Sequence, residues 1–511
     1  MNSTRTGVPA HRRTRDAARL VALLLVLWAS VSADAGAQQP ARPAAQPAAP
    51  AVTPPAQAPA ATPAPAATPQ QPAGLGPLQI TVPQAGRLVA ITNATILTAS
   101  HGTIERGTIV IRDGRIAEIG TNVQVPAGAQ VIDGTGKYVM PGIIDSHAHT
   151  AIETVNEGSN SVTSEVRVED VLRQDGGGIY RELAGGVTTI QVYHGSANTI
   201  GGQSSTLKLR YGLPVDSLYF QGAPLGLKFA LGENVRQTNY QPQAGQPRRY
   251  PLTRMGVEEV LRDAFTRAQA YRREWQAYET ARRAVRRGQP EPLAPRVDLQ
   301  LQPLVEVLEG RRLAHVHAYR AEEMLMMMGV ARDFGFRVAS FEHGLEGYKI
   351  GNELAAAGTG VSTFADFWAY KLEAWDAIPQ NAALMAERGV VVSINSDSDE
   401  RSRRLYQEAA KTVHYGGAPE EEALRMITLN AARQLGIDSR VGSIDVGKDA
   451  DLAIFNGHPF APGSRVEKTL IDGRVFFDRD TAPTLENLIE QMRRQQPRQG
   501  GRPVTSVGGA Q

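Results

Sequence analysis

Short apolar runs, each followed by a more polar helical stretch, recur from Pro141 to about Leu435. Such alternation is typical of a parallel sheet covered by helices. Eight of the runs read as strands, which end near His147, His194, Arg210, Leu231, His317, His343, Ser362 and Asn395. Eight strand–helix units predict an α/β fold of the TIM (β/α)8 type, in which the active site lies at the carboxyl ends of the strands.

The segments on either side of this region have a different pattern. From Val89 to Ile132 the chain alternates in the manner of short strands, and Arg112-Asp-Gly-Arg115 and Ile132-Asp-Gly-Thr135 are typical tight turns. Residues 441–455 and 469–478 again look like strands. We therefore expect one small β-sandwich domain, formed jointly by residues 84–140 and 436–482, around a barrel of residues 141–435.

A long, charged helical pattern from Val257 to Arg287 interrupts the strand rhythm. Its simplest interpretation is an insertion at about 236–300, or a helical hairpin, that lies outside the barrel. The aromatic residues Tyr271, Trp275 and Tyr278 within it are then packing residues rather than a ligand site.

The N-terminus has the pattern of an export signal in residues 1–37. Arg12, Arg13, Arg15 and Arg19 precede an apolar core at 20–28, and Ala35-Gly-Ala37 fits a cleavage site before Gln38. The alternative is an uncleaved anchor. We expect a periplasmic or secreted protein with no stable membrane insertion after cleavage. Residues 38–83, rich in Ala, Pro and Gln, predict a disordered linker, and 483–511 a partly disordered polar tail.

Charge and cysteine content limit the chemistry that is available. The 54 basic and 52 acidic residues nearly cancel, so no nucleic-acid partner is indicated, and a small-molecule substrate is expected. The chain has no cysteine, which excludes disulfides, thiolate metal sites and a cysteine nucleophile. Any metal ion must therefore be held by His, Asp, Glu or a modified Lys. A homo-oligomer remains open.

Potential metal ligands stand at four of the predicted strand ends. The run from Tyr138 to Thr150 ends in Asp145, His147 and His149, and side chains two apart on a strand point to the same side. Imidazole is a common ligand of zinc, so this pair can grip one ion. Each ending alone also fits a structural role, such as a loop histidine or a helix cap. The other three endings are Leu313-Ala-His-Val-His317, Arg337-Val-Ala-Ser-Phe-Glu-His343 and Val390-Val-Val-Ser-Ile-Asn-Ser-Asp397.

Further segments complete a pattern between about Val89 and Asp478 that is similar to a known group of enzymes. They are Gly185-Gly-Val-Thr-Thr-Ile190, Met426-Ile-Thr-Leu-Asn-Ala-Ala432 and Gly442-Ser-Ile-Asp-Val-Gly-Lys-Asp-Ala-Asp-Leu452. Together with the strand ends, they resemble the amidohydrolase superfamily of metal-dependent hydrolases, built on a distorted barrel. Within it the chain looks like the secreted relatives of imidazolonepropionase and Xaa-Pro dipeptidase.

The resemblance implies a site for divalent metal, in the first place two zinc ions. His147 and His149 would bind the more buried ion and His317 and His343 the more exposed one. Asp397 would contact the buried ion and serve as the catalytic base and acid. His315 is then a neighbour on the strand of His317. The bridging ligand would be a carboxylated Lys228, with Lys208 and Glu233 as alternatives.

One departure from the family pattern bears on activity. Deaminases of the superfamily and imidazolonepropionase have a Glu three residues after the fifth-strand His, whereas this chain has Arg320. Arginine is always protonated and cannot shuttle a proton, so both activities are disfavoured. Expected substrate contacts are His194, Tyr319 and Arg320, although a surface role fits Arg320 equally well.

The expected function is that of a secreted hydrolase in which metal-activated hydroxide attacks an amide, lactam or peptide-like C–N bond. An Xaa-Pro-type dipeptidase is the nearest alternative. A barrel that has lost catalysis and serves in binding or assembly is a second alternative.

Overall fold

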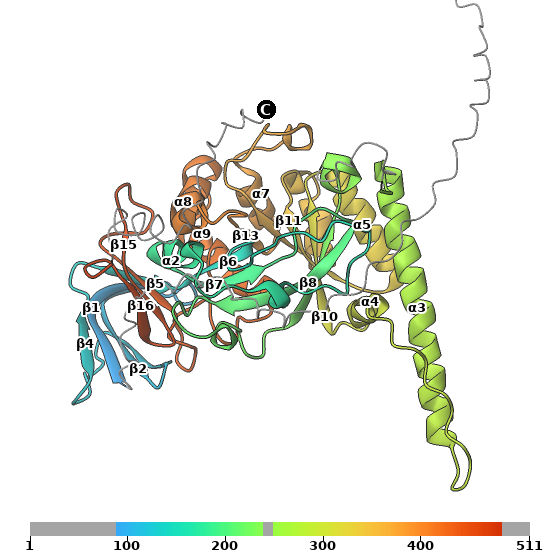
Figure 1. Ribbon diagram of the computed structural model, residues 1–511. Coiled ribbons are helices and arrows are strands. Elements are labelled where there is room, and N and C mark those ends of the chain that lie inside the picture. The colour runs from blue at the N-terminus through green and yellow to red at the C-terminus, as the bar shows by residue number, and fades with distance from the viewer. Residues whose placement is uncertain (1–87, 239–248, 483–511) are drawn as a thin grey trace, which may run out of the picture. The chain divides into compact units, whose positions relative to one another are not determined.

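The middle of the chain folds into an eight-stranded sheet that curves into a barrel (Figure 1). The computed structural model describes residues 88–238 and 249–482; the predicted export signal, linker and tail lie outside these ranges. Neighbouring strands pair in sequence order. The eight strands are β6 (Ile143–Ala148), β7 (Val187–Val192), β8 (Ile200–Lys208), β9 (Leu225–Ala230), β10 (Arg312–Ala318), β11 (Val338–His343), β12 (Gly360–Thr363) and β13 (Val392–Ile394). The predicted distorted barrel is confirmed.

The third strand of the barrel departs from the expected all-parallel arrangement. β8 runs antiparallel to both β7 and β9. Only residues 193–199 connect β7 to β8, too few for the helical crossover that a parallel pair needs. The carboxyl end of β8, which carries Lys208, therefore lies at the opposite end of the barrel from the carboxyl ends of the other strands.

Helices follow most of the parallel strands and cover the barrel. The first is amphipathic and buries Ile179, Tyr180 and Leu183. In the described residues the helices are α2 (Gly177–Ala184), α3 (Arg254–Ala284), α4 (Leu301–Leu308), α5 (Ala321–Phe334), α6 (Gly351–Ala357), α7 (Asn381–Glu387), α8 (Leu405–Gly416), α9 (Glu420–Met426) and α10 (Leu429–Leu435). Within these ranges no helix is both long and apolar enough to cross a bilayer.

The predicted insertion is in part a barrel helix. The N-terminal half of α3 buries Val257, Leu261 and Phe265, and the ring of Phe265 stacks on Phe229 of β9 and on Phe336. The C-terminal turns of α3 extend past this contact (Figure 1). Residues 285–300, which lead back toward the barrel, contain no helix, so α3 has no second helical arm of the kind that a helical hairpin would have.

Strands from both flanks form one further sheet, with β14 pairing antiparallel with β5. The turn at Asp113-Gly114, between β2 and β3, has positive φ at both residues, as a two-residue hairpin requires. Bulges bend β1 around a core that includes Ile91, Ile109 and Leu452. The strands are β1 (Leu88–Leu97), β2 (Thr103–Arg112), β3 (Arg115–Gly120), β4 (Gln130–Asp133), β5 (Tyr138–Pro141), β14 (Leu452–Phe455), β15 (Val466–Ile471) and β16 (Arg474–Asp478).

A buried ion cluster joins β8 to this second sheet. The Lys208 ammonium lies 2.8 Å from Asp449, 3.0 Å from Asp451 and 2.6 Å from Asp472. Burial alone would lower the pKa of Lys208, but the three carboxylates raise it. Lys208 is therefore a buried counter-ion between the barrel and the sheet, which explains why this lysine is fully buried on a strand of the barrel.

Replacing Lys208 by Met should destabilise the protein by about 3–5 kcal/mol, because it leaves buried carboxylates without their shared cation. The measurement is the midpoint of urea or thermal unfolding. Lys468→Met is the matched control: its partly exposed pair with Asp478 should contribute only about 0–1 kcal/mol. Equal midpoints for the two variants would show that the buried cluster does not stabilise the junction.

Candidate metal centre

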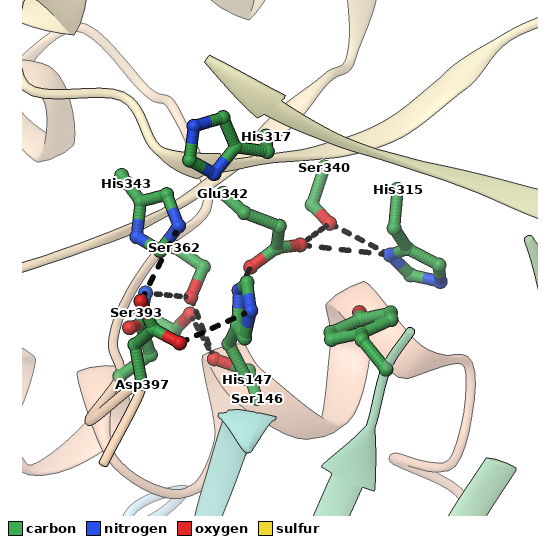
Figure 2. Close-up of polar contacts among 12 residues, drawn as sticks. Ser146, His147, His315, His317, Ser340, Glu342, His343, Ser362, Ser393 and Asp397 are labelled. Atoms are coloured by element: carbon green, nitrogen blue, oxygen red, sulfur yellow. Dashed lines mark hydrogen bonds and ion pairs between the residues drawn. The ribbon is translucent and has the colours of Figure 1, made fainter. Parts of the chain in front are cut away.

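Side chains from three strands converge at the mouth of the barrel (Figure 2). His147 and His149 stand at the end of β6, His343 ends β11, and Asp397 follows β13. Potential ligand atoms of His147, His343 and Asp397 all lie within 4.8 Å of one another. The Nε2 atom of His149 is 3.1 Å from Oδ1 of Asp397. The His317 ring lies beside that of His343, with 4.7 Å between centroids.

The first and last barrel strands are held together at this point by hydrogen bonds of side chains and backbone. The buried carboxylate of Asp145 accepts hydrogen bonds from the backbone N–H groups of His147, at 3.2 Å, and Ser396, at 3.1 Å. The N–H of Asp397 donates to the carbonyl of His147 at 3.1 Å. Ser146 bonds Ser393 at 2.9 Å. These contacts bring Asp397 to the two histidines of β6.

Two of the converging residues have backbone conformations that side chains seldom adopt. His343 has a φ of 77° and Asp397 a φ of 47°. Non-glycine residues in this region carry a strain of order 1–3 kcal/mol each, and such residues cluster at functional sites. The positive φ of His343 has a visible consequence. Strand alternation places the Glu342 side chain in the barrel interior, and the unusual backbone of His343 turns the imidazole inward as well.

Three of the histidines have one ring nitrogen held by a neighbour. The Nδ1 atom of His149 lies 2.9 Å from the carbonyl of Tyr193, and must donate to it. Nδ1 of His147 lies 3.3 Å from the Glu342 carboxylate, and Nδ1 of His317 2.9 Å from the Ser196 hydroxyl. Holding one nitrogen of an imidazole in this way fixes the ring and leaves the other nitrogen available as a ligand.

Burial sets the charge of the site. It lowers the pKa of His147 to about 4, and it lowers the pKa values of His317 and His343 well below the usual range. Burial alone would raise the pKa of Asp397, but His147, His149 and His343 hold it well below its ordinary value. The three imidazoles are thus neutral and the carboxylate ionised at neutral pH, which are the forms that bind metal ions.

Two buried nitrogens of the cluster have no hydrogen-bond partner within residues 88–238 and 249–482. They are Nε2 of His317 and Nδ1 of His343. Buried polar atoms are nearly always satisfied, so orphaned nitrogens beside a carboxylate need an explanation. A divalent metal ion supplies one, because neutral imidazole and carboxylate are ordinary ligands of zinc. The residues present therefore fit a metal ion.

Lys228 of β9 lies inside this cluster. It is fully buried, and its Nζ is 3.1 Å from Nε2 of His147. Burial lowers its pKa to about 8. Across the described chain no carboxylate lies within ion-pair distance of it. Of the two alternatives, Lys208 lies in the ion cluster at the opposite end of the barrel, and the Glu233 carboxylate pairs with Arg236 at 3.9 Å.

A carboxylate that the sequence analysis passed over completes the polar interior. Glu342 contacts His147 with one oxygen, and its other oxygen accepts from Ser340 at 2.5 Å. Ser340 also bonds Nδ1 of His315, at 2.8 Å, so His315 points away from the metal cluster (Figure 2). In the sequence, Glu342 is marked only by its place directly before His343. Because neighbouring side chains of a strand point to opposite sides, the two residues were not expected to share a site.

Two of the three expected substrate contacts, His194 and Arg320, are engaged by other groups of the protein. Both ring nitrogens of His194 bond backbone, Nε2 accepting from Glu157 N–H at 2.7 Å and Nδ1 donating to Gly195 at 2.8 Å. His194 thus anchors a loop and has no nitrogen free for a substrate. Arg320 forms an ion pair with Glu322. Tyr319 is buried, and its ring stacks on His343 at 5.1 Å.

A cavity of ≈ 470 Å³ opens onto one side of the cluster. Its lining includes His149, Asp397 and the first turn of α2 at Gly178. The Asp397 side chain is 30% exposed, so it can be reached from this cavity. A larger cavity, of ≈ 670 Å³, lies between α3 and α4 and contains none of the candidate ligands, so the smaller one is the candidate substrate site.

Comparison with known proteins agrees with this architecture. A model of the Amidohydrolase family matches residues 378–478. The crystal structure of an amidohydrolase from Thermotoga maritima MSB8 is 33% identical, with a TM-score of 0.69, over 76% of this chain and 100% of that one. An imidazolonepropionase of Brevibacillus brevis is 26% identical over 69% of this chain and 84% of its own. The amidohydrolase tasK of Hapsidospora irregularis is 27% identical over 80% of this chain, which spans only 45% of that relative.

A barrel with a histidine–aspartate cluster at its mouth is the arrangement of the metal-dependent hydrolases. The 33% identity to the Thermotoga amidohydrolase, over the whole of that structure, shows the family of this chain. The chain belongs to the amidohydrolase family and is a hydrolase that acts on carbon–nitrogen bonds.

Proposed function

We propose that this enzyme hydrolyses an amide, lactam or peptide-like C–N bond of a small molecule, with two divalent metal ions, zinc in the first place. The observation that carries the proposal is the convergence of His147, His343 and Asp397 within 4.8 Å at the barrel mouth, beside a cavity. A screen of N-acyl amino acids, dipeptides and lactams after metal reconstitution tests it. No turnover of any member by fully loaded protein would contradict it.

The histidines divide into two pairs by position. His147 and His149, with Asp397, would hold one ion, and His317 and His343 the other. A bound divalent metal supplies Lewis-acid activation of water and of a carbonyl group. The neutral imidazoles leave the site with little positive charge of its own, so a doubly charged cation is not repelled.

Asp397 is the group placed to move the proton. Its carboxylate is ionised, partly exposed and surrounded by three histidines. As a general base it would take a proton from the attacking water, and as a general acid it would return that proton to the leaving nitrogen. The hydrogen bond from the Asp397 backbone N–H to the His147 carbonyl holds this residue beside the histidines of β6.

Lys228 is proposed to carry a carbamate that bridges the two pairs. A buried ammonium without a carboxylate partner is costly. When its neutral amine attacks carbon dioxide, Nζ forms a bond to carbon and releases one proton. The product is an anion, which replaces an unpaired cation among the metal ligands. Lys228 lies 3.1 Å from His147, so the carbamate would extend among the histidines.

The imidazolonepropionase relatives do not fix the substrate. The position at which those enzymes place an acid carries Arg320, which is ion-paired with Glu322 and always protonated. We therefore propose that this enzyme does not perform that ring-opening reaction, although it shares the family's C–N bond chemistry.

We also propose that the enzyme works in the periplasm or is secreted, on the strength of the signal pattern in residues 1–37. N-terminal sequencing of protein from the periplasm or culture medium should begin at Gln38. Protein that stays in the cytoplasm and begins at Met1 would contradict it.

Metal uptake by Lys228→Ala should fall by at least one equivalent, because the bridging anion is lost. Wild-type apoprotein should take up less metal from a buffer free of bicarbonate than from one that contains it. The measurement is elemental analysis of desalted protein. Lys468→Ala, far from the barrel mouth, is the control. Full, bicarbonate-independent metal content in Lys228→Ala would show that the lysine is not the bridge.

Turnover by Asp397→Asn should drop by a factor on the order of 10² or more, because the amide cannot accept and return a proton. Folding should be retained, since the Asn side chain has the same size. Activity must be assayed at saturating metal, with metal content measured in the same sample. Asp376→Asn, at an exposed ion pair with Lys349, is the matched control. Normal turnover by fully loaded Asp397→Asn would rule out this role.

A further inference from the structure

Arg401 lies at the edge of the site and, unlike Arg320 and Lys371, has no carboxylate partner among the described residues. Arg401 follows Asp397 by four residues, and its Nη1 donates to the carbonyl of Ser396 at 2.9 Å. Since Ser396 immediately precedes Asp397, this hydrogen bond holds the guanidinium next to the candidate proton-transfer group. The backbone N–H of Arg401 also donates to the Ser398 hydroxyl at 3.3 Å, which shapes the connecting turn.

The guanidinium contacts the faces of two aromatic rings, Phe367 and Phe364, which form a wall that reaches the histidine–aspartate cluster. Its Cζ is 3.8 Å from the ring centre of Phe367 and 5.3 Å from that of Phe364. The Phe364 ring stacks in turn on His343, with 4.8 Å between centroids. Contact with the ring face positions the guanidinium, and the N–H donors that are not bonded to Ser396 can then serve a ligand. The Phe364 ring therefore lies in contact with both Arg401 and the candidate ligand His343.

This wall is anchored in place. The segment after β12 that carries Phe364 and Phe367 is tied down by Glu373, whose buried carboxylate accepts from the Glu233 N–H at 2.9 Å and pairs with Lys371 at 2.7 Å. The hydroxyls of Tyr370 and Tyr319 are 2.5 Å apart. The surface against which Arg401 rests is thus pre-formed.

Arg401 has no carboxylate partner within ion-pair distance among the residues that the structure describes. The acids nearest to it are already engaged: Glu408 and Asp366 both bind Lys411, and Asp397 faces the histidines. Arg404, which repels it, pairs with Glu408. Burial lowers the pKa of Arg401, with only partial compensation from these carboxylates. Two exposed or half-buried cations near the mouth, Arg320 and Lys371, pair instead with Glu322 and Glu373.

We propose that Arg401 binds a carboxylate of the substrate, so that the enzyme prefers N-acyl amino acids or dipeptides, with the free carboxylate close to the scissile C–N bond. A planar guanidinium matches the two oxygens of a carboxylate, and one cation balances its single charge. The aromatic wall then accepts an apolar side chain. This inference rests on the proposed function and takes the carboxylate role away from Arg320.

The test compares two probes of nearly equal size, N-acetyl-L-phenylalanine and its C-terminal amide, which differ by one negative charge. Their binding to metal-loaded protein is measured by calorimetry in an Asp397→Asn background, which suppresses hydrolysis of the probes, with positions 401 and 403 as wild type, with Arg401→Met or with Arg403→Met. Arg403 is the matched control, because it lies two residues away and pairs with Glu400 outside the aromatic wall.

Wild type and Arg403→Met should bind the acid more tightly than the amide. Arg401→Met should weaken binding of the acid by a factor on the order of 10 to 100, the range for a lost hydrogen bond to a charged group, and leave the amide unchanged. Equal losses for both probes would mean a merely structural role, and wild type without preference for the acid would also overturn the inference. Because binding is measured without turnover, these outcomes are distinct from failure of the proposed hydrolysis.

Discussion

The site depends on how the barrel closes between its first and last strands. Within the described sheet, β6 and β13 are the two ends of the strand order and meet through side chains. Asp145 receives N–H groups from both strands, and Asp397 bonds back to the carbonyl of His147. Only this closure places the carboxylate after the eighth strand against the histidines of the first. It is achieved with a fully buried Asp145, whose pKa burial raises to about 7 despite the hydrogen bonds from Ser396 and His147.

Burial then decides the chemistry of the cluster. Neutral imidazoles with unsatisfied nitrogens, an ionised Asp397 and an unpaired Lys228 together form an interior that is poorly satisfied by protein groups alone. Strain at His343 and Asp397 adds to this cost. Elsewhere the barrel and the second sheet are linked by a cluster in which the three carboxylates around Lys208 also meet Arg210 and Arg440. The two buried lysines differ in their neighbours: Lys208 lies among three carboxylates, whereas Lys228 has none within ion-pair distance among the described residues.

The strand ends and the polar residues that converge there could be predicted from the sequence because those signals are local. His147 and His149 repeat at the spacing of a strand face, and apolar runs end where the polar residues begin. The sequence did not predict that β8 runs antiparallel, since direction depends on the seven-residue connection and on pairing with β9. The place of Glu342 in the site could not be predicted, because the positive φ of His343 turns two consecutive side chains into the barrel. The aromatic support of Arg401 comes from a segment more than thirty residues away along the chain, which no local pattern reveals.

Diffraction from metal-loaded crystals, measured at the absorption edge of the metal, will decide whether this cluster is a two-metal centre. We expect one anomalous peak against His147, His149 and Asp397 and a second against His317 and His343, with density for a carbamate on Lys228 between them. Loaded crystals without a peak among these five side chains, or with metal bound only elsewhere, would contradict it.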